Sequence, residues 1–124
     1  MGEKKNILKD NSFQFAINII KLYKYLVESK KEFVLSKQLL RSGTAVGAMI
    51  REAQNAESKN DFIHKLAIAQ KECDETVYWL ELLKETNYME LNEFTNIHNE
   101  AESLLKMIRS AILTTKQKLI THNS

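Results

Sequence analysis

The sequence predicts an all-α fold: an antiparallel, up-down-up-down four-helix bundle that forms one domain over residues 1–124. Three observations point to it. The chain has 124 residues, a length that suits a single hydrophobic core. It contains no proline and only three glycines, too little turn chemistry for a sandwich or a barrel. Apolar residues recur at intervals of three and four along four segments, as they do on the buried face of a helix.

The first helix is expected at about residues 13–30. Its apolar stripe consists of Phe15, Ile19, Leu22 and Leu26. Asp10, Asn11 and Ser12 precede it and are candidate N-caps, because each side-chain oxygen can accept from a free amide of the first turn.

The second helix is expected at about residues 34–56, with Leu35, Leu39, Val46 and Ile50 on its apolar side. Gly43 and Gly47 stand one turn apart inside it. Each costs about 1 kcal/mol relative to alanine, so the pair requires a reason. The spacing favours a face where another backbone approaches closely; the alternatives are a broken helix or a tolerated irregularity.

The third helix is expected at about residues 59–86. Ser58 is its predicted N-cap, with Asp61 three residues later as in a capping box. Two apolar flanks indicate contact with more than one neighbour. Asn87 can take the left-handed conformation that ends a helix where glycine is absent.

The fourth helix is expected at about residues 93–118, with Asn92 as N-cap and Glu93 at the positive end of the helix dipole. The chain termini are expected to fray. Short connections near residues 31–33, 57–58 and 87–92 make consecutive helices antiparallel.

The sequence contains little that resembles a catalytic or metal-binding pattern. Asp61 and His64 form an acid-x-x-His pair, but a ferritin-like site needs two such pairs and two further glutamates. Cys73 falls on an apolar stripe, where a thiol is normally inert. We therefore expect no enzyme, no metal and no cofactor. The single cysteine and the lack of an apolar run of about 20 residues predict a cytoplasmic protein without a membrane segment.

The net charge of +2 conceals an uneven distribution. Residues 1–33 carry seven basic and four acidic side chains, whereas residues 58–87 carry four and six. The basic first segment, which includes Lys4, Lys5 and Lys9, could contact an anionic polymer such as RNA or DNA. The alternative is an ordinary solvated helix face.

Charged residues also lie among apolar positions of the second and third helices: Arg41, Arg51, Glu52, Glu72 and Glu75. Pairing between helices or subunits is the favoured interpretation, ahead of paired-carboxylate catalysis. Tyr78 and Trp79 add apolar surface that one bundle does not cover on all sides. Such surface predicts self-association.

The stretch from Ser36 to Leu83 resembles the bacterial 23S rRNA-intervening-sequence proteins, also called the S23-type family. The resemblance rests on residues spread over this stretch at constant spacing: Gln38, Arg41, Ser42, Gly43, Gly47, Arg51, Glu52, Ala53, Ser58 to Phe62, Ile68, Ala69, Glu72, Glu75 and Tyr78 to Leu80. Two positions depart from the family pattern, which has Ser in place of Ala45 and Asn in place of Met49.

The resemblance implies a four-helix bundle that assembles into a homopentamer, without enzymatic activity. It also implies a relation to accessory proteins of retroelement reverse transcriptases. The leading hypothesis is an oligomer that binds RNA or DNA through phosphates; the candidate contacts are Lys21, Lys24, Lys37, Arg41, Arg51 and Lys59. The competing hypothesis is a protein-interaction scaffold, or an accessory subunit of a polymerase, without nucleic-acid contact. The candidates for close packing or assembly are Gly43, Gly47, Tyr78 and Trp79.

Overall fold

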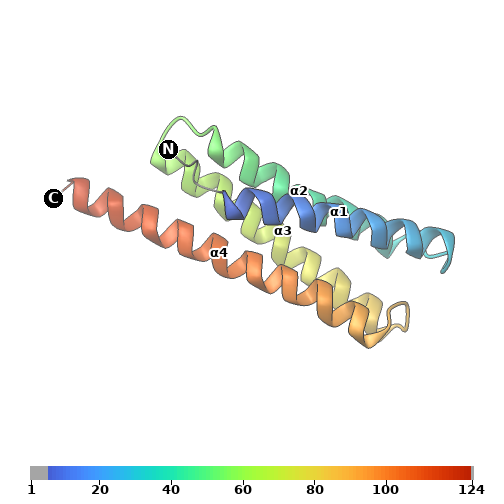
Figure 1. Ribbon diagram of the computed structural model, residues 1–124. Helices are drawn as coiled ribbons and strands as arrows, with labels where there is room; N and C mark the ends of the chain where they lie inside the picture. Colours follow the sequence, from blue (N-terminus) through green and yellow to red (C-terminus); the bar gives the residue numbers. More distant parts are fainter. Residues whose placement is uncertain (1–5, 124) are drawn as a thin grey trace.

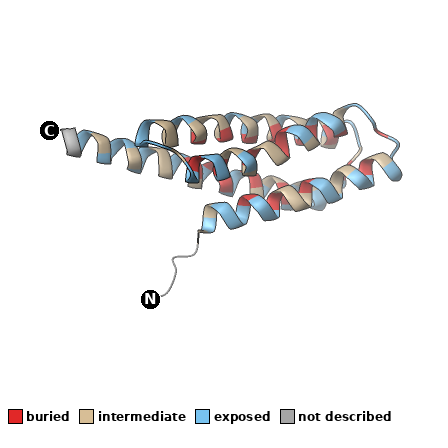
Figure 2. Cartoon of the chain, turned by 90° about the horizontal axis from the view of Figure 1, so that it is seen from above, coloured by how far each residue is buried: buried red, intermediate tan, exposed pale blue. Residues whose placement is uncertain are grey.

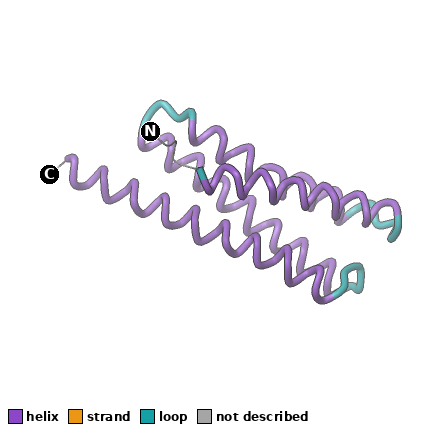
Figure 3. The backbone as a smooth tube through the Cα atoms, in the orientation of Figure 1, coloured by secondary structure: helices purple, strands orange, loops and turns teal. Residues whose placement is uncertain are grey.

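A computed structural model describes residues 6–123, with side chains as far as Thr121. Its four helices are α1 (Ile7–Glu28), α2 (Leu35–Gln54), α3 (Lys59–Glu85) and α4 (Leu91–Asn123). They run alternately up and down and are joined by short loops (Figures 1 and 3). The predicted all-α four-helix bundle is thereby confirmed. Lys4 and Lys5, which the sequence added to the basic first segment, lie outside the described residues.

The helices stand at the four corners of the bundle. Each helix packs against the next one along the chain, and α1 also contacts α4. The α1–α2 pair and the α3–α4 pair therefore form opposite faces. Helix α4 has 33 residues and is the longest, and its C-terminal part extends beyond the other three (Figure 1).

The core follows the predicted apolar stripes. Buried residues line the inward sides of the helices, and exposed residues cover the outside (Figure 2). Phe15, Ile19 and Leu26 of α1 are fully buried, as are Leu39 and Val46 of α2. The three-and-four spacing therefore located the core, because residues at that spacing share one side of a helix.

The beginning of α1 was predicted wrongly. The helix begins at Ile7, six residues before the predicted start, and it ends at Glu28. Its N-cap is Asn6, whose side-chain oxygen accepts from the Lys9 amide at 3.0 Å. The expected caps Asp10, Asn11 and Ser12 lie inside the helix. Leu8 packs against the core, and this contact supports the additional turns.

Both ends of α4 also differ from the prediction. The helix begins at Leu91, so Asn92 is not its cap, and the Glu93 carboxylate instead accepts from the Glu90 amide at 3.2 Å. The helix continues to Asn123, five residues beyond the predicted end at residue 118. Its last three turns consist mainly of lysine, glutamine, leucine and threonine, which contain no helix breaker.

The boundary of α3 agrees with the prediction. The Ser58 hydroxyl accepts from the Asp61 amide at 3.0 Å, so Ser58 is the N-cap. At the other end, Asn87 adopts the predicted left-handed conformation with a φ of 68°. The two signals work because side-chain capping and tolerance of positive φ are local properties of these residue types.

The two glycines of α2 lie in an unbroken helix where α1 approaches it closely. A Cβ atom at Gly43 would lie 2.8 Å from both Cγ atoms of Ile19, and one at Gly47 would lie 3.3 Å from the carbonyl oxygen of Ser12. Both distances are shorter than ordinary carbon contacts. The glycines thus allow α1 and α2 to pack closely within one chain; their use in assembly stays a prediction.

Helix α2 begins with a cap that the sequence did not reveal. The buried Glu32 carboxylate accepts the amides of Val34, Leu35 and Ser36 at 2.6–3.1 Å. Burial alone raises the pKa of this carboxyl, but the bonds from these three amides outweigh it and hold the pKa below its ordinary value. The charged cap fixes the turn between α1 and α2.

Candidate functional site

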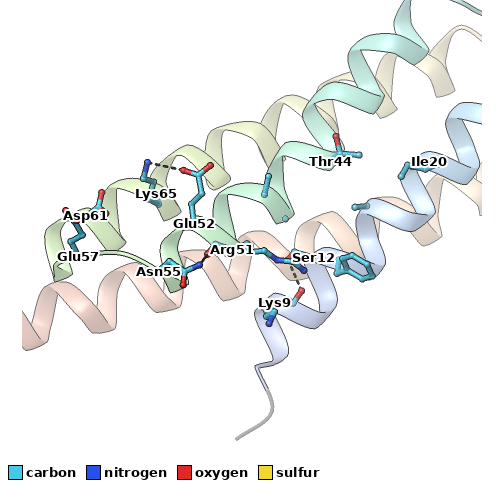
Figure 4. A pocket seen from close by; sticks show the side chains of 14 residues that line it. Lys9, Ser12, Ile20, Thr44, Arg51, Glu52, Asn55, Glu57, Asp61 and Lys65 are labelled. Carbon is cyan, nitrogen blue, oxygen red and sulfur yellow. Dashed lines mark hydrogen bonds and ion pairs between the residues drawn. The ribbon is translucent and has the colours of Figure 1, made fainter.

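A groove of about 730 Å³ lies on the α1–α2 face and reaches the first turns of α3 (Figure 4). Small residues of α2, namely Thr44, Gly47 and Ala48, line it. Phe13 and Ile20 of α1 are the apolar groups beside them, and they are 55% and 37% exposed. The groove thus combines apolar side chains of α1 with small residues of α2.

The charges around the groove are mixed. Arg51 lies over the ring of Phe13, with 5.7 Å between the guanidinium carbon and the ring centroid. Lys65 of α3 pairs with Glu52 of α2 at 3.1 Å, as Figure 4 shows. Three basic and three acidic side chains line the groove in total: Lys9, Arg51, Lys65, Glu52, Glu57 and Asp61. This balance gives the groove no strong preference for an anion.

Arg41, another predicted nucleic-acid contact, belongs to an ion cluster between α2 and α3. Its guanidinium pairs with Glu72 at 3.3 Å and also with Glu75. The Trp79 indole donates to Glu75 at 3.1 Å. This indole bond, together with Arg41, holds the pKa of Glu75 below its ordinary value against the effect of burial. Two carboxylates thus compensate Arg41, as the interhelical-pairing interpretation expected.

The predicted basic contacts do not form one site. Lys24 and Lys37 lie on the α1–α2 face, towards the turn that joins these helices. Lys21 instead lines the seam between α1 and α4, beside Glu93 and Glu100. Arg51 and Lys59 lie at the opposite end of the bundle. A single straight phosphate backbone could not contact all of them along one helix face.

A separate cationic surface lies at the C-terminal end of α4. After Glu102, the chain has no further acidic residue, but it has four basic ones: Lys106, Arg109, Lys116 and Lys118. Lys59 of α3 joins this region, where Thr114, Gln117, Lys118 and Thr121 line a shallow depression with it. We call Lys59, Lys116 and Lys118, with the polar groups of the depression, the cationic end.

Sequence reasoning included Lys59 but missed the rest of the cationic end. The charge balance over residues 88–124 is four against four, which hides the separation of the two signs. The four acidic residues all fall between residues 90 and 102, and the four basic ones between residues 106 and 118. A count over each half of α4 would have found this signal.

The two aromatic assembly candidates lie in different environments. Tyr78 is 54% exposed, whereas Trp79 is partly buried and packs against the core. Their rings meet edge to face with 5.0 Å between the centroids. Tyr78 is therefore the aromatic side chain of α3 that a partner could cover.

Cys73 has the environment of a core residue. It is fully buried, and its thiol donates to the carbonyl oxygen of Ala101 at 3.4 Å. Burial, with smaller effects from Asp74 and Glu102, raises the pKa of the thiol to about 12. A thiol that stays protonated is a poor nucleophile.

The described part of the chain comprises residues 6–123. Within it, no group of three or more histidine, cysteine or acidic side chains is placed to hold a metal ion. None of its helices combines the length and apolar character that a membrane span requires.

This chain resembles known proteins of one family. A family model described as 23S rRNA-intervening sequence protein matches residues 4–110. A crystal structure from Bacteroides thetaiotaomicron VPI-5482, of a protein with unknown function from the S23 ribosomal protein family, is similar with 52% identity and a TM-score of 0.85; the match covers 86% of this chain and 96% of that one. The curated proteins give no match. With most of its length matched by the family model, the chain belongs to the 23S rRNA-intervening sequence protein family.

Proposed function

We propose that this chain is a non-enzymatic, self-associating protein that binds RNA or DNA through backbone phosphates at the cationic end. The observation that carries the proposal is the depression formed by Lys59, Thr114, Gln117, Lys118 and Thr121. It combines two ammonium groups with hydroxyl and amide groups, and no carboxylate is among the described residues that line it. Lysine, threonine and glutamine are side chains that contact phosphate oxygens in nucleic-acid complexes.

The position of the cationic end supports this role. The C-terminal part of α4 extends beyond the other helices, so none of the other three helices covers its last turns (Figure 1). Lys116 and Lys118 are exposed there. The contacts would be to phosphates rather than to bases, and they would not select a sequence.

Self-association is the second part of the proposal. Exposed Tyr78 on one face and exposed Phe13 and Ile20 beside the groove on the opposite face support it, because apolar surface of this kind favours contact with another protein. The resemblance to the family suggests a pentamer. The same exposed residues would serve a protein partner, such as a polymerase, in the competing scaffold hypothesis.

Fluorescence anisotropy with a labelled 30-nucleotide RNA and the matching duplex DNA tests nucleic-acid binding. We expect the logarithm of the association constant to fall linearly with the logarithm of the salt concentration. The variant Lys59→Gln/Lys116→Gln/Lys118→Gln should reduce the magnitude of this slope by about 2 to 3, because each lost phosphate contact contributes about 0.7 to 0.9.

A matched control removes three positive charges away from the cationic end, with Lys21→Gln in α1 and Lys30→Gln and Lys31→Gln in the α1–α2 turn. It should change the slope much less, although the net charge of the two variants is equal. Equal losses in both variants would show attraction by net charge alone and refute the cationic end as the site. Absence of wild-type binding at 50 mM salt would refute the nucleic-acid function itself and favour the scaffold.

A further inference from the structure

The seam between α1 and α4 contains a long groove. The two helices run side by side in opposite directions along it (Figure 1). Two adjoining depressions of about 480 and 350 Å³ follow the seam, and they share Asn18, Asn96 and Glu100. Together they reach from Asn11 to Tyr25 on α1, which is a length of about 21 Å at 1.5 Å per residue. We call the two depressions together the seam groove.

Carboxamides stand on both walls of the seam groove. They are Asn11, Gln14, Asn18, Asn96 and Asn99. One of them bridges the two helices: the Asn18 nitrogen donates to the Glu100 carboxylate at 2.9 Å, and its oxygen accepts from Gln14 at 3.3 Å. The carboxamides of Asn11, Asn96 and Asn99 are exposed and have no hydrogen-bond partner among the described residues. These three side chains are therefore free to bind a ligand.

The free carboxamides match the main chain of a peptide. Each presents donors and an acceptor side by side, as a peptide unit does with its N–H and C=O groups. A helix uses these main-chain groups internally, whereas an extended segment leaves them free. An extended chain rises about 3.3 Å per residue, so a groove of about 21 Å accommodates about six residues.

Apolar side chains lie at the bottom of the seam groove. They are Leu22, Met89, Ile97, Leu104 and Met107, which belong to the core or pack against it. Successive side chains of an extended peptide point in opposite directions, so every second one would face this apolar floor. Aliphatic side chains suit these positions, because their contact with the floor removes apolar surface from water.

The charges of the seam groove do not suit a nucleic acid. Lys21 is the one cation among the described residues that line it, and Glu93 and Glu100 line it beside Lys21. Lys24 and Lys106 adjoin lining residues in the sequence but line neither depression. A phosphate backbone binds to lysine and arginine and would meet more carboxylates than ammonium groups here. A peptide main chain is uncharged, and a basic side chain on it could pair with a carboxylate of the groove.

We propose that the seam groove binds an extended peptide segment of a partner protein. About six of its residues form main-chain hydrogen bonds with the carboxamides of Asn11, Asn96 and Asn99. Its alternate aliphatic side chains face the apolar floor, and a lysine or arginine side chain lies beside Glu93. The inference concerns a different surface from the cationic end, so it goes beyond the proposed nucleic-acid binding and does not depend on it.

Selection from a display library of random eight-residue linear peptides tests the proposal. Immobilised wild-type protein is the target, and peptides that bind the variant Asn96→Ala/Asn99→Ala are removed. The enriched peptides should have aliphatic residues at every second position and one lysine or arginine. In fluorescence anisotropy, a labelled enriched peptide should bind the variant at least about tenfold more weakly, because two hydrogen-bonding side chains are lost. Methylation of alternate peptide nitrogens should also weaken binding, because it removes main-chain donors.

The control Gln54→Ala/Asn60→Ala removes two exposed carboxamides outside the seam groove and should bind the peptide like the wild type. Circular dichroism verifies that the variants fold. If Asn96→Ala/Asn99→Ala does not fold, Asn99→Asp replaces it, because this change keeps the side-chain shape and removes the donors.

Three results would overturn the peptide site. The selection could enrich no peptide, or enrich only peptides that bind Asn96→Ala/Asn99→Ala as tightly as the wild type. Alternatively, a 30-nucleotide RNA could displace the peptide from the wild type and bind Asn96→Ala/Asn99→Ala more weakly, which would identify the seam groove as a nucleic-acid site. The lysine variants of the cationic end test phosphate binding separately, so the failure of either proposal can be recognised on its own.

Discussion

Replacing Gly43 by alanine tests the close approach of α1 and α2. The new Cβ atom would lie 2.8 Å from two carbon atoms of Ile19, whereas carbon atoms in contact prefer about 3.5–4.0 Å. Ile19 is fully buried, and its β-branched side chain has few rotamers in a helix. The side chain cannot turn away, so α1 must shift or the atoms must overlap.

The expected loss of stability combines two opposing effects. Overpacking a tight core costs about 1–3 kcal/mol. The cost of Gly43→Ala should fall in the upper part of this range, because its Cβ atom clashes with two atoms of Ile19. Alanine recovers about 1 kcal/mol through its higher helix propensity. We therefore expect Gly43→Ala to lower the free energy of unfolding by about 1–2 kcal/mol. Urea unfolding followed by circular dichroism measures it, at one fixed protein concentration because association shifts apparent stability.

Two comparisons separate the clash from a general effect of the substitution. Gly47→Ala gains the same propensity, but its Cβ meets the Ser12 carbonyl oxygen at 3.3 Å, so it should stay within about 1 kcal/mol of the wild type. Ile19→Ala should cost less in the Gly43→Ala background than in the wild type, because it removes the clashing atoms. If Gly43→Ala is as stable as the wild type, or if Ile19→Ala costs the same in both backgrounds, the reasoning is wrong.

Two further predictions concern buried groups. Glu32→Gln should lower stability by about 1–2 kcal/mol at pH 7, because it replaces a charged helix cap. The pKa of Glu32 is lowered in the folded chain, so its stabilisation is complete above the ordinary value of 4.5 and is lost as the pH falls below it. The urea midpoints of the wild type and Glu32→Gln should therefore converge in acid, and a pH-independent difference would contradict this cause. Cys73, with a pKa raised to about 12, should react with a disulfide reagent at pH 8 only after urea unfolds the chain; rapid reaction of the folded protein would disprove its burial.

The sequence was sufficient to predict the four helices because their apolar spacing depends only on helix geometry. Ser58 and Asn87 were also predictable, since each acts on its own backbone neighbourhood. The start of α1 was not, because Asp10, Asn11 and Ser12 are as suitable as N-caps as Asn6 when packing is unknown. Leu8 packs against the core, and this contact favours the earlier start of the helix after Asn6.

The candidate site was less predictable than the fold. Glu72 and Glu75, which compensate the charge of Arg41, lie 31 and 34 positions after it in the chain. A local sequence pattern cannot show a pairing over that distance. The depression at the cationic end joins Lys59 to residues of α4 through the antiparallel packing of α3 and α4. Lys59 and the polar side chains of α4 lie together only because of the register between α3 and α4.

The length of α4 has a consequence for the shape of an assembly. If copies form the ring that the family resemblance suggests, they all point the same way and their extended helix ends emerge on one side. The resulting particle would have two unlike poles, one surrounded by lysines and the other formed by the α1–α2 and α3–α4 turns. A nucleic acid bound at the helix end of one copy would encounter the helix ends of the other copies at high local concentration. Weak individual contacts would therefore combine into a high overall affinity. Such a particle would bind its polymer on one side only and leave the other pole free.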